Sequence, residues 1–117
     1  MSTPPPVEGP LSPAEGPPPA VDEVIHHPTR LALMGFLSGC HEAEFAAVRD
    51  YCRISDASVS RIVSALEQAE YVKVRKGYVG KRPRTWLSLT PVGRRALEAH
   101  LSALQAIVDH ARAAATA

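Results

Sequence analysis

The stretch SDASVSRIVSALEQAEYVKVRKGYVGKRPRTWLSLTP, residues 55–91, decides the fold. Its apolar residues first recur at the spacing of one helix face: Val59, Ile62, Val63 and Leu66. Two segments of alternating character follow, Tyr71–Lys76 and Thr85–Leu89, with glycines and a proline between them. The stretch therefore predicts a helix over Asp56–Ala69 and then a β-hairpin.

The outer face of this helix is unusual in composition. Ser55 is a good N-cap, and Asp56 sits favourably at the positive end of the helix. The residues opposite the apolar stripe and beside it are small or hydrogen-bonding: Ala57, Ser58, Ser60, Arg61, Ser64 and Gln68. A face that only meets solvent would more usually carry Glu and Lys. This composition predicts contact with a partner surface.

The hairpin region is strongly basic. Between Tyr71 and Arg95 the chain has no acidic residue but eight basic ones: Lys73, Arg75, Lys76, Lys81, Arg82, Arg84, Arg94 and Arg95. The formal net charge of +1 conceals this local excess. Residues 1–29 carry a charge of −4, whereas residues 30–117 carry +5. A concentrated basic surface favours a polyanionic partner.

Two further helices are predicted upstream. Pro28 suits the first position of a helix, which Gly39 ends. Glu42–Cys52 reads as a second helix, and a brief extended piece around Glu44 and Phe45 is the alternative at its start. The side chains expected to face inward from the second helix are Phe45, Val48, Tyr51 and Cys52.

Thr90 and Pro91 cap and open a final helix that runs toward Ala115. Its apolar residues recur at spacings of 4, 3, 4 and 3: Leu97, Leu101, Leu104, Val108 and Ala111. We call this row the α-helical seam; it predicts packing against a partner helix and hence a homodimer. Packing on the chain's own core is the alternative, because the row spans only about two heptads.

The first nineteen residues hold eight of the eleven prolines and few large apolar side chains. Such a segment cannot bury enough surface to offset its ordering entropy, which predicts a disordered tail over 1–20. It also lacks the basic start and apolar core of a secretory signal. The remaining domain boundaries are predicted at 21–90 for the folded module and 91–117 for the dimerisation helix.

The order helix, helix, helix, basic hairpin, long helix is the plan of a winged helix-turn-helix, an α+β fold that is mainly α. A helix with a thin outer face fits a major groove about 12 Å wide, while a basic hairpin holds the adjacent backbone. The residues predicted to bind double-stranded DNA are Ala57, Ser58, Ser60, Arg61, Ser64, Gln68, Arg75, Lys76, Lys81, Arg82 and Arg84. Arg61 can also pair with Asp56 or Glu67.

Several motifs resemble those of MarR-like winged helix transcriptional regulators, in particular the short single-domain forms. They cover roughly residues 21–108: His27–Leu31, Glu44–Arg49, Ser55–Arg61, Gly80–Trp86 and Leu89–Gly93. The resemblance implies a homodimer that acts on a near-palindromic operator, with an effector near the dimer interface in many members. One departure is Glu70, where such proteins usually have glycine: either Glu70 takes a left-handed conformation or the helix exits differently.

Other functions find less support in the sequence. The histidines and cysteines His26, His27, Cys40 and His41 lack metal-ligand spacing, so no metal or cofactor is predicted and a metal-responsive repressor is only an alternative. Cys40 and Cys52 show no disulfide pattern, and a redox switch there is an alternative. No phosphate-binding glycine loop or nucleophile motif suggests an enzyme. A winged helix used only for protein interaction is the main rival.

Together these patterns predict a dimeric, sequence-specific DNA-binding transcriptional regulator, with repression as the expected sign. No apolar run approaches the roughly 20 residues that span a bilayer. The expected location is cytoplasmic.

Overall fold

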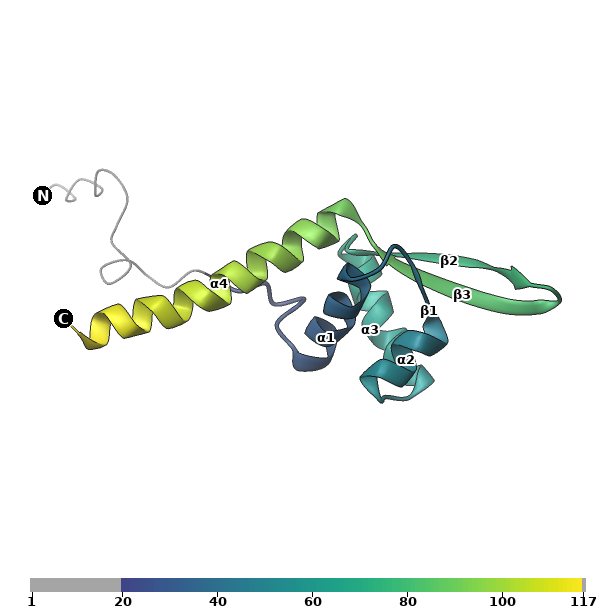
Figure 1. The fold of residues 1–117 in the computed structure, drawn as a ribbon, viewed down its shortest axis with the longest axis horizontal. Coiled ribbons are helices and arrows are strands. Elements are labelled where there is room, and N and C mark those ends of the chain that lie inside the picture. Colours follow the sequence, from purple (N-terminus) through teal and green to yellow (C-terminus); the bar gives the residue numbers. More distant parts are fainter. Residues whose placement is uncertain (1–19, 117) are drawn as a thin grey trace, which may run out of the picture. The chain divides into compact units, whose positions relative to one another are not determined.

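The computed structural model describes residues 20–116, so the predicted Pro-rich tail lies almost wholly outside the described residues. The elements (Figure 1) are α1 (Pro28–Ser38), β1 (Ala43–Glu44), α2 (Phe45–Cys52), α3 (Asp56–Gln68), β2 (Val72–Val79), β3 (Arg82–Leu89) and α4 (Pro91–Ala115). The predicted fold class, α+β and mainly α with a winged helix-turn-helix, is confirmed. Among residues 20–116, no helix combines the length and apolar character needed to cross a membrane.

Residues Asp22–His100 form one compact unit around a single hydrophobic core. The side chains with no exposed surface come from the segment before α1 and from α1, α2, α3 and β3: Ile25, Leu33, Met34, Leu37, Val48, Val59, Leu66 and Leu87. Full burial of one such side chain stabilises the fold by about 1.5–3 kcal/mol. The first ten residues of α4 belong to the same unit, because Leu97 is also part of this core.

The second predicted helix differs from the structure at its start. Ala43 and Glu44 form the short strand β1, which pairs with Leu87 and Trp86 of β3, and α2 begins only at Phe45. The predicted inward orientation of Tyr51 is wrong, since Tyr51 is 59% exposed and stacks on Phe36 at 4.9 Å between ring centroids. With eight residues, α2 buries Val48 alone completely.

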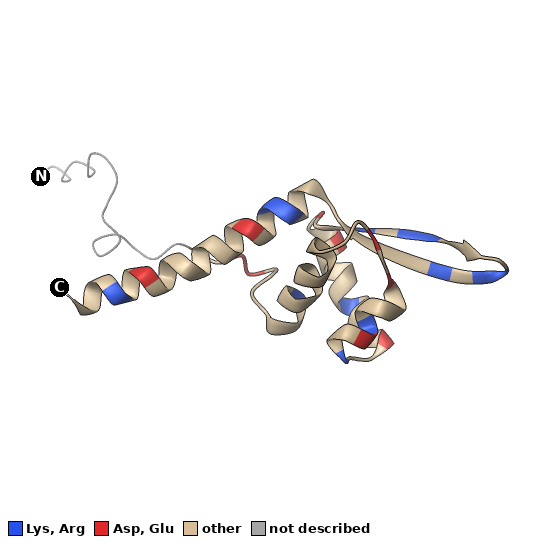
Figure 2. Ribbon diagram, in the orientation of Figure 1, with Lys and Arg blue, Asp and Glu red and all other residues tan. Residues whose placement is uncertain are grey.

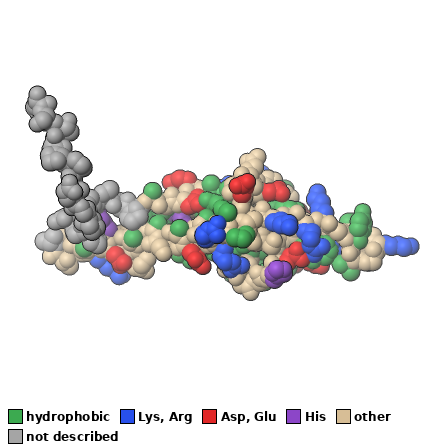
Figure 3. Space-filling model, turned by 90° about the horizontal axis from the view of Figure 1, so that it is seen from above, with side chains coloured by type: hydrophobic (Ala, Val, Ile, Leu, Met, Phe, Trp, Pro, Cys, Tyr) green, Lys and Arg blue, Asp and Glu red, His purple; other side chains and the backbone are tan. Residues whose placement is uncertain are grey.

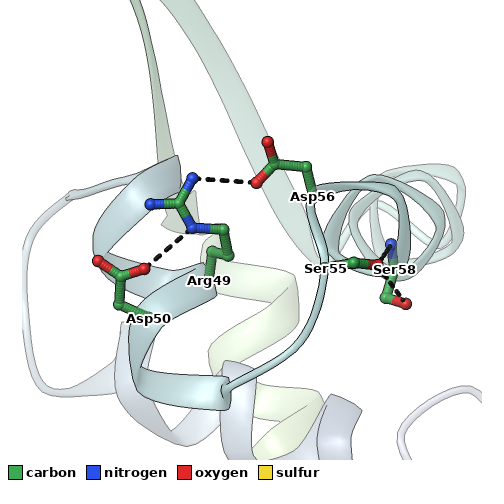
Figure 4. Close-up of polar contacts among 5 residues, drawn as sticks. All are labelled: Arg49, Asp50, Ser55, Asp56 and Ser58. Atoms are coloured by element: carbon green, nitrogen blue, oxygen red, sulfur yellow. Dashed lines mark hydrogen bonds and ion pairs between the residues drawn. The ribbon is translucent and has the colours of Figure 1, made fainter.

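The start of α3 is capped as predicted. The Ser55 hydroxyl accepts a hydrogen bond of 3.1 Å from the Ser58 amide (Figure 4). Arg49 of α2 donates to Asp50 at 2.9 Å and to Asp56 at 3.1 Å, which ties the two helices together across the turn (Figure 4). These contacts raise the pKa of Arg49, first through Asp50 and then through Asp56. The cap and the ion pairs fix where α3 begins.

The hairpin of β2 and β3, called the wing from here on, is longer than predicted. The expected strands ended at Lys76 and began again at Thr85, but pairing continues to Val79 and Arg82. Gly77 and Pro83 therefore lie within strands. Pro83 is tolerated because β1 pairs with β3 only at residues 86 and 87, so beyond them β3 has an open edge. Gly80, with a φ of +64°, begins the two-residue turn.

The end of α3, the base of the wing and the start of α4 meet at one place, called the corner from here on. Glu70 takes the left-handed conformation, with a φ of 64°. Of the two predicted alternatives, a left-handed Glu70 or a different exit of the helix, the first is therefore the one that forms. Thr90 donates from its hydroxyl to the Glu70 carbonyl at 2.6 Å and from its amide to the Tyr71 carbonyl at 3.0 Å. The Gly93 amide in turn donates to the Thr90 hydroxyl at 2.8 Å.

Gly93 is required at the corner for a steric reason. A Cβ on this residue would overlap the carbonyl oxygen of Tyr71 and lie 2.8 Å from its Cα. Such contacts are with backbone atoms, so no rotamer change relieves them. The first turn of α4 therefore packs directly on the chain that enters the wing.

An N-terminal arm, residues 22–27, packs beside the corner. The Asp22 carboxylate of this arm accepts a 2.6 Å hydrogen bond from the Tyr71 hydroxyl. The backbone amide of Asp22 donates to His100 Nδ1 at 3.2 Å. The bond to the Asp22 carboxylate raises the pKa of Tyr71. The arm thus links the entry to the wing with the end of the compact unit in α4.

Candidate nucleic-acid interface

The outer face of α3 is exposed along its whole length. The side chains of Ala57, Ser60, Arg61, Ser64 and Gln68 are all exposed, as their spacing predicted. Ser58 is different, because it is half-buried and its hydroxyl accepts hydrogen bonds from Ser55 at 3.0 Å and from Arg61 at 3.1 Å. Ser58 therefore orients Arg61. The predicted alternative, a pair between Arg61 and an acid, is not what forms: Asp56 pairs with Arg49 instead.

A groove of about 740 Å³ separates α3 from the wing. The α3 side contributes the hydroxyls of Ser60 and Ser64 and the carboxylate of Glu67. Lys76 and Thr85 line the opposite side. The groove is therefore bordered by hydrogen-bond donors on both walls. Two further carboxylates line it, Asp56, which is paired with Arg49, and Glu44, which lies 3.8 Å from Arg84.

Two predicted basic residues of the wing are held by acids that precede α2. Glu42 accepts two hydrogen bonds from Arg75, at 2.7 and 2.9 Å, and Glu44 lies 3.8 Å from Arg84. The Arg75 guanidinium also lies over the Trp86 ring, 4.1 Å from its centroid. The hydrogen bond from Arg75 is the main cause that lowers the pKa of Glu42. Arg75 and Arg84 are thus partly neutralised within the protein.

The positive charge that remains lies further along the wing. Lys76, Lys81 and Arg82 are exposed, and within residues 20–116 no acid forms an ion pair with any of them. The ribbon shows the same division, with basic residues along the wing and no acidic residue in its outer half (Figure 2). The electrostatic surface offered to a partner is thus the outer part of the wing.

Sequence reasoning missed two residues of this surface. Glu67 lies in the groove, and its helical position beside Ser64 was the signal that it shares that wall. Tyr78 is 73% exposed on the outer wing, where the sequence suggested only a loop. The strand alternation from Val72 and Val74 would have placed it on the same wing face as Lys76.

The residues of the α-helical seam fall into two groups. Leu97 is only 5% exposed and packs in the core of the compact unit. The remaining ones belong to the part of α4 after His100: Leu101 and Val108 are 49% and 42% exposed, Ala111 is exposed and Leu104 is half-buried. This second part is a regular helix with large apolar side chains open to contact.

The cysteines and histidines are placed separately. The Cys40 thiol lies 3.7 Å from the carbonyl oxygens of Phe36 and Leu37, and burial raises the pKa of the Cys52 thiol. In the part of the chain that is described, no group of three or more His, Cys, Asp or Glu residues is arranged to hold a metal ion. A raised pKa leaves Cys52 less thiolate, the form that reacts with oxidants.

Comparison with known proteins agrees with this architecture. A family model described as a winged helix DNA-binding domain matches residues 29–108. A transcriptional regulator homologue from Pyrococcus horikoshii OT3 is 28% identical, with 74% of this chain and 85% of that one covered and a TM-score of 0.68. No curated protein sequence matches the chain significantly.

Two other solved structures share the fold at lower identity. The protein BpsR of Bordetella bronchiseptica is 17% identical, with 76% of this chain and 67% of that one covered and a TM-score of 0.62. A MarR-family protein from Enterococcus faecalis V583 is 19% identical, with 80% and 84% covered and a TM-score of 0.63.

The contact between Glu42 and Arg75 predicts a pH-dependent wing. Glu42 has a lowered pKa, so the pair is complete above the ordinary glutamate value of 4.5 and is lost as the pH falls through the lower folded-state value. Trp86 is the only tryptophan, and Arg75 covers it. We expect its fluorescence to change on acidification below pH 4.5, and E42Q to show the changed emission already at neutral pH.

The matched control is E44Q, which removes the longer contact with Arg84 and leaves Arg75 on Trp86. It should keep the emission and the acid transition of the wild type. Far-UV circular dichroism separates this change from unfolding. An E42Q protein with wild-type emission at pH 7 and an unchanged titration would contradict the assignment.

Proposed function

The chain belongs to the family of winged helix DNA-binding domains, and we propose that it is a sequence-specific transcriptional regulator that binds double-stranded DNA as a homodimer. Its predicted resemblance to MarR-like winged helix regulators is confirmed. The observation that carries the proposal is the groove between the hydroxyl-rich face of α3 and a wing whose outer half has only basic charges. The proposed positions of α3 and of the wing on DNA follow from how a duplex fits these two walls.

α3 is proposed to lie in the major groove. Its exposed face consists of alanine, serine, arginine and glutamine, so the helix is narrow enough for a groove about 12 Å wide. Arg61, oriented by Ser58, can donate two hydrogen bonds to the O6 and N7 atoms of guanine. Such a bidentate contact gives about 1–3 kcal/mol of discrimination against other bases.

The groove of about 740 Å³ is proposed to receive one DNA backbone strand. A strand of phosphates separates the major groove from the neighbouring minor groove, so it must pass between α3 and the wing. The hydroxyls of Ser60 and Ser64 can donate to phosphate oxygens, with Lys76 opposite. Glu67 repels a phosphate at the C-terminal end of α3, whereas Asp56 at the other end is paired with Arg49. The strand is therefore expected to cross beside Ser60 and Ser64.

The wing supplies affinity that does not depend on sequence. Lys81 and Arg82 at its turn, together with Lys76, can neutralise phosphates and release counterions. Arg75 serves mainly to hold the wing, since Glu42 and Trp86 already engage it. This division would let a few bases be read by α3 while the wing fixes the register.

Dimerisation is proposed through the part of α4 after His100. Leu101, Leu104 and Val108 follow the spacing of a two-helix contact. A two-fold dimer presents two copies of α3 to a near-palindromic operator, with half-sites about 34–36 Å apart when they lie one helical turn apart. Bound at a promoter, such a dimer would act as a repressor.

Two further points belong to the proposal. DNA binding by the B. bronchiseptica relative is regulated by 6-hydroxynicotinic acid. By analogy, a small-molecule effector is proposed to regulate this chain as well. A winged helix used only for protein interaction remains the second candidate. That function does not explain why the outer wing and its turn carry basic side chains and no acidic ones.

The DNA proposal predicts two different mutant phenotypes. K81A/R82A should weaken binding to all duplexes and reduce the slope of log affinity against log salt concentration by about two units. R61A should instead relax preference at one base pair and leave the slope nearly unchanged. Fluorescence anisotropy with duplexes that the wild type selects from a random library measures both effects.

The control R95A/R112A removes the same charge from exposed positions of α4 and should leave a wild-type salt slope. If the wild type selects no duplex even at low salt, the interaction-module function takes its place.

The dimer proposal predicts that L101E/V108E is monomeric, because two charges at exposed seam positions oppose helix pairing. Light scattering should give twice the chain mass of 12.5 kDa for the wild type and the single mass for the variant. The control A99E/S102E adds the same charge at exposed positions outside the seam and should remain dimeric. An L101E/V108E protein of double mass would exclude the seam as the interface.

A further inference from the structure

The outer wing carries exposed apolar side chains that no contact within the fold explains. Tyr78 is 73% exposed and Val79 is 54% exposed. The other wing aromatic, Trp86, is half-buried beneath Arg75 nearer the base of the wing. Figure 3 shows hydrophobic side chains beside a basic one at the wing end. An exposed tyrosine here adds nothing to the stability of the core.

The register of the wing places Tyr78 on a definite face. Tyr78 pairs with Pro83, and strand alternation puts it on the face of Lys76, Thr85 and Leu87. Those three residues line the groove next to α3, whereas Tyr78 lies beyond the groove on the same face. A DNA strand in the groove would therefore have Tyr78 on its far side, toward the minor groove.

The part of the wing that carries the Tyr78 side chain is rigid. The strands remain paired to Val79 and Arg82, and Pro83 opposite Tyr78 has a fixed φ. At the base, Arg75 is held between Glu42 and Trp86. The turn itself is open, since a Cβ on Gly80 would have no atom within 4 Å. A rigid support with free space around it allows a side chain to be inserted into a partner.

The charges near Tyr78 identify the kind of partner. Lys76 shares its face of the wing, Lys81 lies in the turn and Arg82 lies on the opposite face, and among the described residues none of the three is paired with an acid. Between paired strands the backbones are about 4.8 Å apart, so the hairpin with its side chains is too wide for an undistorted minor groove of about 6 Å. Entry therefore requires the groove to widen, which a wedge between base pairs brings about.

Resting on the DNA-binding function proposed above, we propose that Tyr78 is a wedge: its ring enters the minor groove at a flexible pyrimidine–purine step, partly unstacks it and bends the DNA. Lys81 and Arg82 hold the phosphates on either side. Pyrimidine–purine steps unstack most readily, so the step is read through its deformability without a base-specific hydrogen bond. The preferred DNA thus carries such a step beside the bases that α3 contacts.

The test uses the full chain and a 30-base-pair duplex that the wild type selects from a random library. Dyes on the two ends report bending by energy transfer, and 2-aminopurine at the step reports unstacking. The wild type should bend the duplex by an angle on the order of 20–90° and raise the 2-aminopurine emission severalfold. Y78F should behave the same, because the ring and not the hydroxyl acts as the wedge.

Y78S should still bind but leave the duplex nearly straight and the 2-aminopurine stacked. Replacing the flexible step by a stiff A-tract should cost the wild type about tenfold in affinity and Y78S much less. The matched control is Y51S, which removes the exposed tyrosine of α2 and should bend DNA like the wild type.

The outcomes separate the two proposals. A wild type that binds but leaves the DNA straight, or a Y78S protein that bends it fully, overturns the wedge and leaves the DNA-binding function intact. A Y78F protein that loses bending overturns the wedge in favour of a hydroxyl contact. A wild type that selects no duplex overturns the DNA-binding function and the wedge with it.

Discussion

The close approach of Gly93 to the Tyr71 backbone is the constraint on which the other elements depend. No side chain fits between the first turn of α4 and the residue that enters the wing. Thr90 bonds to both Glu70 and Tyr71, so the exit of α3, the base of the wing and the start of α4 are joined within a few residues. The left-handed backbone of Glu70 belongs to the same corner, where its cost of about 1–2 kcal/mol is offset by these bonds.

From this corner the electrostatics of the wing follow a gradient. Near the base, Glu42 and Glu44 partly neutralise Arg75 and Arg84, and Trp86 packs against Arg75. Toward the turn, Lys76, Lys81 and Arg82 have no acidic partner among the described residues. The paired arginines at the base help to hold the hairpin in place, while the unpaired basic residues near the turn remain available to a polyanion. Basic residues therefore have two roles, and their distance from the base of the wing determines which one they have.

Local patterns in the sequence were enough for most of the fold. Apolar periodicity, the Ser55 cap and the Thr90–Pro91 start predicted α3 and α4 because these signals act within a few residues. The wing strands were predicted too short, since Gly77 and Pro83 usually break strands and only the open edge of β3 explains why Pro83 does not. The partners of Arg75 and Tyr71 lie 33 and 49 residues away, and no local pattern reveals such pairs. For the same reason the exposure of Tyr78 needed the strand register.

The most direct test of the central claim, that the corner holds the wing and the helices together, is the free energy of unfolding of G93A by urea denaturation. Overpacking against backbone should destabilise G93A by about 1–3 kcal/mol or more. G35A is the matched control: its Cβ has no atom within 4 Å, so this exchange in α1 should stabilise the protein by about 0.4–1 kcal/mol. A G93A protein as stable as the wild type would contradict the account.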